Sequence, residues 1–154
     1  MNKQELAAKI WESANQMRSK IEASEYKDYI LGFIFYKFLS DRQLIFLRNE
    51  GATEEEILDL TEDNVEYVDH IRSNLGYFIS YPNLYSTWVS KGHDFDISDV
   101  RDGLSAFSRL IDTTHKKVFD GIFTTLETGL SKLGGRAARQ TKAARDPIHL
   151  IKDI

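Results

Sequence analysis

The side chains that could do chemistry are few and scattered in this chain of 154 residues. It contains no cysteine, which excludes a disulfide scaffold, a thiolate zinc site and a cysteine nucleophile. Each of the four histidines is isolated in sequence, as is typical of structural or surface histidines rather than of metal ligands. These histidines are His70, His93, His115 and His149.

One acidic segment resembles the start of a calcium-binding loop. Asp94, Asp96 and Ser98 fall at the first, third and fifth positions, which supply oxygen ligands in such loops. The sixth position, however, requires glycine and is Asp99, while the twelfth requires glutamate and is Ser105. Helix capping by solvated carboxylates is therefore the better interpretation of this segment.

Patterns of hydrolases and nucleases fail in the same way. Glu25-Tyr26-Lys27 has the E-x-K spacing of some metal-dependent nucleases, but it opens a predicted helix, whereas those residues usually project from strands. The nucleophile-elbow pattern that would begin at Gly103 fails at Phe107, and His115 is followed by Lys116 rather than by glutamate. The sequence therefore predicts no catalytic and no metal-binding residue.

The charge of the chain is unevenly distributed. Its net charge is −4, yet the residues from Thr128 onward include six basic and two acidic side chains, a formal +4 against −8 for the rest. Residues 133–145 of this segment are small and basic and lack a core face, and hydrophobic residues return only after them. The basic segment is either a solvated linker or a surface that neutralises DNA phosphates. The candidate DNA-contact residues are Lys132, Arg136, Arg139, Lys142 and Arg145.

The elements that would position these residues are mainly helices, because Pro82 and Pro147 are the only prolines. An apolar stripe with helical spacing predicts a first helix over 3–21. The segment 26–47 is apolar almost all the way round, which is typical of a helix buried on all sides. We therefore expect a mainly α fold, a helical bundle around this central helix.

Shorter signals follow the central helix. Thr53 and Glu56 form a capping-box pattern, and a helix over 63–75 should end at Gly76. Residues 77–91 lose helical periodicity, and extended pieces at 77–82 and 94–97 predict a small two-stranded element near 77–97. Ser98 is then the expected N-cap of a helix that reaches about residue 113.

An aromatic set in this region has two interpretations. Aromatic side chains anchor protein interfaces, but they also fill cores, and packing within this domain is the favoured interpretation. The partner-surface candidates are Tyr77, Phe78, Tyr81, Tyr85 and Trp88.

The sequence shows neither a signal peptide nor a membrane span. The most apolar run, 29–36, is interrupted by Lys37 and Asp41 well short of the length that a span needs. A cytoplasmic location is expected.

Several longer segments carry a family resemblance. The sequences at 10–18, 21–32 and 38–42 are similar to the start of the modification (M) subunit of type I restriction-modification systems. The segments 75–79, 118–123 and 131–134 resemble the same family. The resemblance extends over nearly the whole chain.

This resemblance implies a helical N-terminal domain that precedes a DNA methyltransferase domain. The complete subunit would use S-adenosylmethionine to methylate adenine N6. It would assemble with a specificity subunit, a second modification subunit and a restriction subunit on duplex DNA. The N-terminal domain would help to clamp DNA and would contact the neighbouring subunits.

The chain departs from the full family pattern at the catalytic motifs. It lacks the Asn/Asp-Pro-Pro-Tyr/Phe motif, and Gly134-Gly135 follows a charged helical region rather than a strand. No catalytic or cofactor residue is therefore carried over, and the chain alone is expected not to be an enzyme. We expect a helical domain over 1–130 and a basic segment over 131–154 that leads toward a methyltransferase domain. The alternative is a stand-alone helical adaptor that binds only protein.

Overall fold

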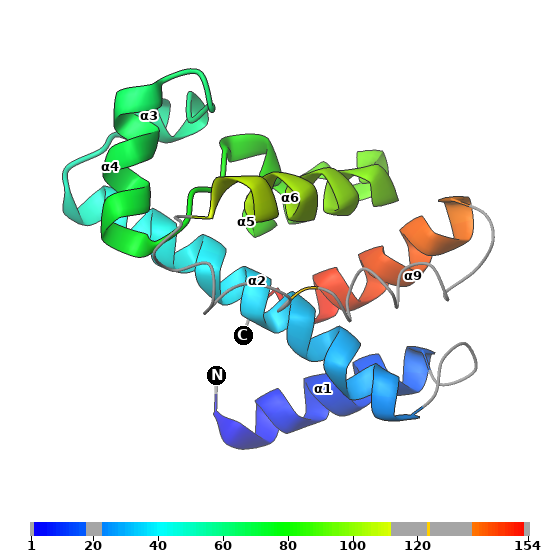
Figure 1. The fold of residues 1–154 in the computed structure, drawn as a ribbon. Helices are drawn as coiled ribbons and strands as arrows, with labels where there is room; N and C mark the ends of the chain where they lie inside the picture. Colours follow the sequence, from blue (N-terminus) through cyan, green and yellow to red (C-terminus); the bar gives the residue numbers. More distant parts are fainter. Residues whose placement is uncertain (1, 18–22, 112–122, 124–136, 153–154) are drawn as a thin grey trace.

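The computed structural model describes residues 2–17, 23–111, 123 and 137–152, and every regular element among them is helical (Figure 1). The α-helices are α1 (Lys3–Met17), α2 (Ala23–Asn49), α3 (Glu54–Leu58), α4 (Val65–Leu75), α5 (Tyr85–Lys91), α6 (Ile97–Leu110) and α9 (Ala137–Leu150). Two short 3-10 helices are η1 (Tyr81–Asn83) and η2 (Gly92–Asp94). None of the described helices is both long and apolar enough to cross a bilayer.

The long helix α2 is the central element of the fold and confirms the helix expected over 26–47. Both α1 and α5 pack against it. One of its faces is fully buried and contributes Phe33, Tyr36, Leu39 and Leu47 to the core. The prediction of a mainly α bundle around this helix is therefore confirmed.

The opposite face of α2 corrects one expectation. Leu31, Phe38 and Ile45 remain 44%, 58% and 58% exposed, so the helix is not buried on all sides. An apolar helix is fully buried only where neighbouring elements surround it. The described helices of this chain leave that face uncovered.

The expected two-stranded element near 77–97 is absent from the described residues, and that prediction was wrong. The segment 77–80 is irregular, and it forms hydrogen bonds with α2 instead of pairing with a strand. Tyr77 donates its hydroxyl proton to the backbone oxygen of Leu39 at 2.7 Å, and Gln43 hydrogen bonds to both backbone groups of Ile79. Residues 92–94 form η2, and α6 begins at Ile97.

Local signals at the helix ends are largely confirmed. The Thr53 hydroxyl accepts the Glu56 amide at 3.2 Å, and Glu56 accepts the Thr53 amide in return, which completes the capping box. Gly76 ends α4 with a φ of 93°, a left-handed conformation that favours glycine. The N-cap of α6 is Asp96, not Ser98, because the Asp96 carboxylate accepts the Ser98 amide.

The C-terminal helix α9 is part of the fold. It packs against α1, α5 and α6. Thr141 and Ala144 are buried, so the expectation that residues 133–145 lack a core face was wrong. Ile148 and Ile151, in the hydrophobic stretch that follows, are buried too. The apolar stripe of this helix is narrow and lies among alanine and arginine residues, so its helical spacing is not evident in the sequence. The expected domain division at residue 130 stays a prediction.

Candidate functional site

Among the described residues, three hydrogen bonds hold α9 on the rest of the domain. The Thr141 hydroxyl accepts the backbone amide of Ile97 at 2.9 Å, at the start of α6. The Tyr85 hydroxyl donates to the Ile148 carbonyl at 2.6 Å. All three bonds join a side chain to a backbone group, and the third comes from Arg145. The basic helix therefore has a defined orientation on the domain.

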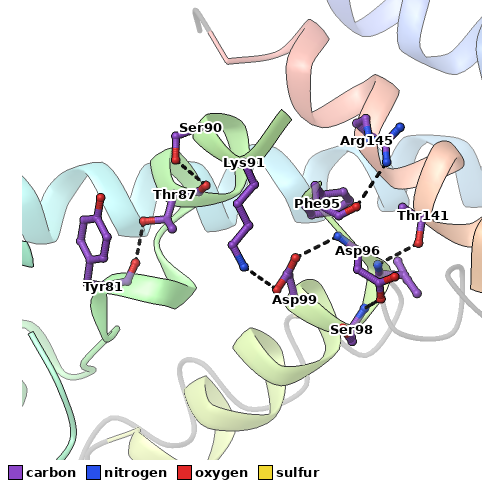
Figure 2. Close-up of polar contacts among 11 residues, drawn as sticks. Tyr81, Thr87, Ser90, Lys91, Phe95, Asp96, Ser98, Asp99, Thr141 and Arg145 are labelled. Carbon is purple, nitrogen blue, oxygen red and sulfur yellow. Dashed lines mark hydrogen bonds and ion pairs between the residues drawn. The ribbon is translucent and has the colours of Figure 1, made fainter. Parts of the chain in front are cut away.

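Arg145 is the one candidate DNA-contact residue whose side chain the structure describes. Its guanidinium group is partly buried, and Nη2 donates to the Phe95 carbonyl at 3.2 Å (Figure 2). Its Nε is buried and has no hydrogen-bond partner among the residues that the structure describes. This geometry gives Arg145 a role in docking α9 onto the loop before α6 rather than a free position on the surface.

The other four basic candidates are placed less completely. Arg139 and Lys142 lie on α9, but their side chains fall outside the described part of the chain. Lys132 and Arg136 lie outside the described residues altogether. Their contact with DNA stays a prediction.

The acidic segment that resembled a calcium loop caps α6. Hydrogen bonding from Ser98, mainly from its backbone amide, lowers the pKa of the Asp96 carboxyl below its usual value. Asp99 accepts the Asp96 amide at 2.9 Å and the Lys91 ammonium at 2.7 Å, as Figure 2 shows. The described residues contain no group of three or more potential metal ligands. The capping interpretation therefore describes this segment.

The aromatic partner-surface candidates lie mainly in the core. Tyr77, Phe78, Tyr85 and Trp88 are at most 1% exposed, and only Tyr81 is half-buried. Trp88 stacks on Tyr36 with ring centroids 4.6 Å apart. Burial raises the pKa of both Tyr77 and Tyr85, so their hydroxyls stay protonated. Packing, the favoured interpretation, fits these four side chains.

Sequence reasoning missed an acidic lobe, which we define as residues 50–69 and which includes α3 and the first five residues of α4. This stretch has nine acidic residues and neither lysine nor arginine, and that bias was visible in the sequence. The structure adds a surface pocket of about 580 Å³ there. The pocket is lined by Glu50, Gly51, Ala52, Glu56, Asn64, Glu66, Tyr67 and His70.

The electrostatics of this pocket are negative. Its lining includes Glu50, Glu56 and Glu66 but no lysine or arginine, and His70 Nε2 lies 2.9 Å from both carboxylate oxygens of Glu50. Burial, together with the charges of Glu56 and Glu50, raises the pKa of Tyr67. A surface of this kind repels a polyanion such as DNA.

Comparisons with known proteins agree with this architecture. A family model described as the HsdM N-terminal domain matches residues 6–142. A curated relative, the type I restriction enzyme MpnII methylase subunit of Mycoplasma pneumoniae, is 26% identical over 155 aligned positions, which cover 90% of this chain. The chain spans 28% of the length of that relative.

A solved structure shares the fold. The crystal structure of the type I restriction-modification system methyltransferase subunit from Streptococcus thermophilus superposes with a TM-score of 0.76 at 23% identity. The match covers 99% of this chain and 34% of that one. Because the family model covers most of the sequence, the chain belongs to the HsdM N-terminal domain family of type I restriction-modification methyltransferase subunits.

Proposed function

We propose that this chain is a non-catalytic domain that serves subunit assembly and DNA clamping in a type I modification complex. The proposal rests on the separation of acidic and basic residues in this chain, within a fold that methylase subunits share. In Figure 1, α3 and α4 of the acidic lobe lie at one end of the molecule, and the basic helix α9 begins on the opposite side and runs back toward the middle of the fold.

The charge distribution favours one approach of a DNA duplex. Residues 136–145 include four basic side chains and no acidic one. A duplex that approaches α9 gains counterion release at each phosphate contact, whereas the acidic lobe repels it. Because Arg145 holds α9 in place, we assign the phosphate contacts to the other basic residues, Lys132, Arg136, Arg139 and Lys142.

Catalysis is assigned to the remainder of the parent subunit. A site for S-adenosylmethionine in this family needs a strand followed by a glycine turn, and the described residues include no strand. They do not fit that cofactor, and the adenine-methylating motif needs adjacent prolines, which the sequence lacks. Isothermal calorimetry with S-adenosylmethionine should give no saturable heat, and a micromolar affinity would contradict this assignment.

The partners in this account are duplex DNA, a specificity subunit, a second modification subunit and a restriction subunit. The alternative is a helical adaptor that binds only protein. The inward orientation of Arg145 favours this alternative, because the guanidinium group of this basic candidate already bonds to the Phe95 carbonyl. Titration of a labelled duplex separates the two. DNA binding that falls steeply with salt supports clamping, and its absence at low salt supports the adaptor.

A further inference from the structure

The uncovered face of α2 forms a regular apolar stripe. Leu31, Phe38 and Ile45 follow one another at seven-residue intervals and are 44%, 58% and 58% exposed. Residues seven apart lie on the same side of a helix, almost in line with its axis. The Phe38 ring stacks on half-buried Phe35 at a centroid distance of 6.3 Å, so the stripe is continuous with the packed part of the helix.

One charged residue lies within this stripe. Arg42 is exposed, four residues after Phe38 and three before Ile45, and therefore shares their side of the helix. Its charge acts on the Tyr77 hydroxyl, whose pKa it lowers against the larger effect of burial, but no hydrogen bond or ion pair joins its guanidinium group to a described residue. An arginine between exposed apolar side chains can stabilise a partner that brings a carboxylate to it.

We propose that this stripe is the docking surface for an amphipathic helix of a partner subunit. The partner helix would present apolar side chains at seven-residue intervals and a carboxylate opposite Arg42. The seven-residue spacing matches the geometry in which two helices interlock side chains along a seam, and Arg42 fixes the charge and register of the partner. This inference deepens the assembly part of the proposed function and rests on it.

Two designed helical peptides test the stated chemistry. Both carry leucine at seven-residue intervals, and they differ only in a glutamate or a lysine opposite Arg42. Binding is measured by fluorescence anisotropy of the labelled peptides. The glutamate peptide should bind the wild-type chain about tenfold more tightly than the lysine peptide. Arg42→Glu should reverse that preference, and 0.5 M salt should weaken it (the screening length is then only about 4 Å).

Variants of the stripe locate the binding site. Phe38→Glu and Ile45→Glu should abolish peptide binding, while their exposure allows the fold to persist, as circular dichroism would check. Leu58→Glu and Val65→Glu are matched controls, because these apolar side chains are 54% and 63% exposed in the acidic lobe. Both controls should bind the glutamate peptide like the wild-type chain.

The outcomes separate this inference from DNA clamping. Equal binding of both peptides, or full binding by Phe38→Glu, would overturn the docking proposal. Sedimentation that shows a wild-type dimer broken by Phe38→Glu would overturn it too, because a second copy would then occupy the stripe. Duplex binding by Phe38→Glu should equal that of the wild-type chain. If Phe38→Glu still binds the duplex, DNA clamping stands even when neither peptide binds the chain and the docking proposal fails.

Discussion

Gln43 on α2 and Ile79 in the segment after α4 exchange two hydrogen bonds inside the core. The Gln43 amide nitrogen donates to the Ile79 carbonyl at 2.6 Å, and the Ile79 amide donates to Gln43 Oε1 at 2.8 Å. Both residues are buried. The side-chain carboxamide thus satisfies a backbone segment as a neighbouring strand would, which is why residues 77–80 can enter the core without a sheet.

Replacing Gln43 with leucine should strongly destabilise the domain. The change leaves the buried N–H and C=O of Ile79 without partners, at an expected cost of about 2–4 kcal/mol in the free energy of unfolding. Urea denaturation followed by circular dichroism measures this loss. Gln4→Leu on the exposed side of α1 is the control and should change stability little. A loss in Gln43→Leu no larger than in that control would refute the role assigned to the carboxamide.

This pair also shows which parts of the fold the sequence could predict. Periodicity predicted α2 and most of α1, α4 and α6, because those signals are local. The two-stranded element is what the sequence predicts from the aromatic-rich stretch 77–82, which ends in a proline turn. Its replacement depends on Gln43, which lies 36 residues away, and a single polar residue in a helical pattern does not reveal its partner.

Any side chain at Gly103 on α6 is expected to lower the stability of the fold. A Cβ there would lie 2.8 Å from Trp88 Cζ2 and 3.2 Å from the Tyr36 hydroxyl oxygen. The Tyr36 hydroxyl is itself held by a 2.7 Å hydrogen bond to the Asn83 carbonyl. Overpacking should outweigh the gain in helix propensity, so Gly103→Ala should lose about 1–2 kcal/mol.

The control for this prediction lies on the same helix. Ser105→Ala changes an exposed position and should be neutral or slightly stabilising. Thermal unfolding followed by tryptophan fluorescence reports on both variants. A stability gain in Gly103→Ala equal to that in Ser105→Ala would contradict the close approach of Trp88.

The N-cap Asp96 should make stability depend on pH. Its pKa is lowered in the folded state by hydrogen bonds from Ser98, so the ionised form stabilises the fold. That contribution is present above the unfolded pKa of about 3.9 and is lost as pH falls through the lower folded pKa. Asp96→Ala should therefore cost about 1 kcal/mol at pH 7, and the difference from wild type should shrink at acid pH.

Asp96→Asn separates capping from charge. Asparagine can accept the same amide hydrogen bond but does not titrate. Its stability relative to Asp96→Ala should therefore stay constant with pH when both are unfolded with urea between pH 2 and pH 7. A gap between wild type and Asp96→Ala that persists unchanged at pH 2 would refute the ionised cap.

The docking of α9 should depend on Tyr85. Tyr85→Phe removes the 2.6 Å hydrogen bond to the Ile148 carbonyl and should cost about 1–2 kcal/mol. Hydrogen–deuterium exchange of the α9 amides should accelerate with it. Tyr81→Phe alters a half-buried hydroxyl for comparison and should leave α9 protected. Unchanged exchange in Tyr85→Phe would mean that this bond does not hold the helix.

The candidate site could be predicted only in part. The basic residues of 132–145 were identifiable by charge alone, because phosphate contacts need little more than exposed lysine and arginine. The inward position of Arg145 could not be predicted, since its acceptor is the backbone carbonyl of Phe95, 50 residues earlier. The exposed face of α2 was equally hidden, because apolar composition does not reveal which neighbours a helix has.

The most direct test of DNA clamping is the salt dependence of duplex binding. Fluorescence anisotropy of a labelled duplex is measured for the wild-type chain and for Arg139→Glu/Lys142→Glu. A second double variant, Lys3→Glu/Arg48→Glu, makes the same change in net charge at exposed residues of α1 and α2. Arg145 is kept in every protein so that α9 stays docked.

For the wild-type chain we expect the logarithm of the binding constant to fall with the logarithm of salt concentration, by about 0.9 for each phosphate contact. Arg139→Glu/Lys142→Glu should lose roughly two units of that slope and most of the affinity, while Lys3→Glu/Arg48→Glu should keep the wild-type slope. An equal loss of duplex affinity in both double variants would show that the effect depends only on net charge. No wild-type binding even at low salt would contradict clamping by this domain.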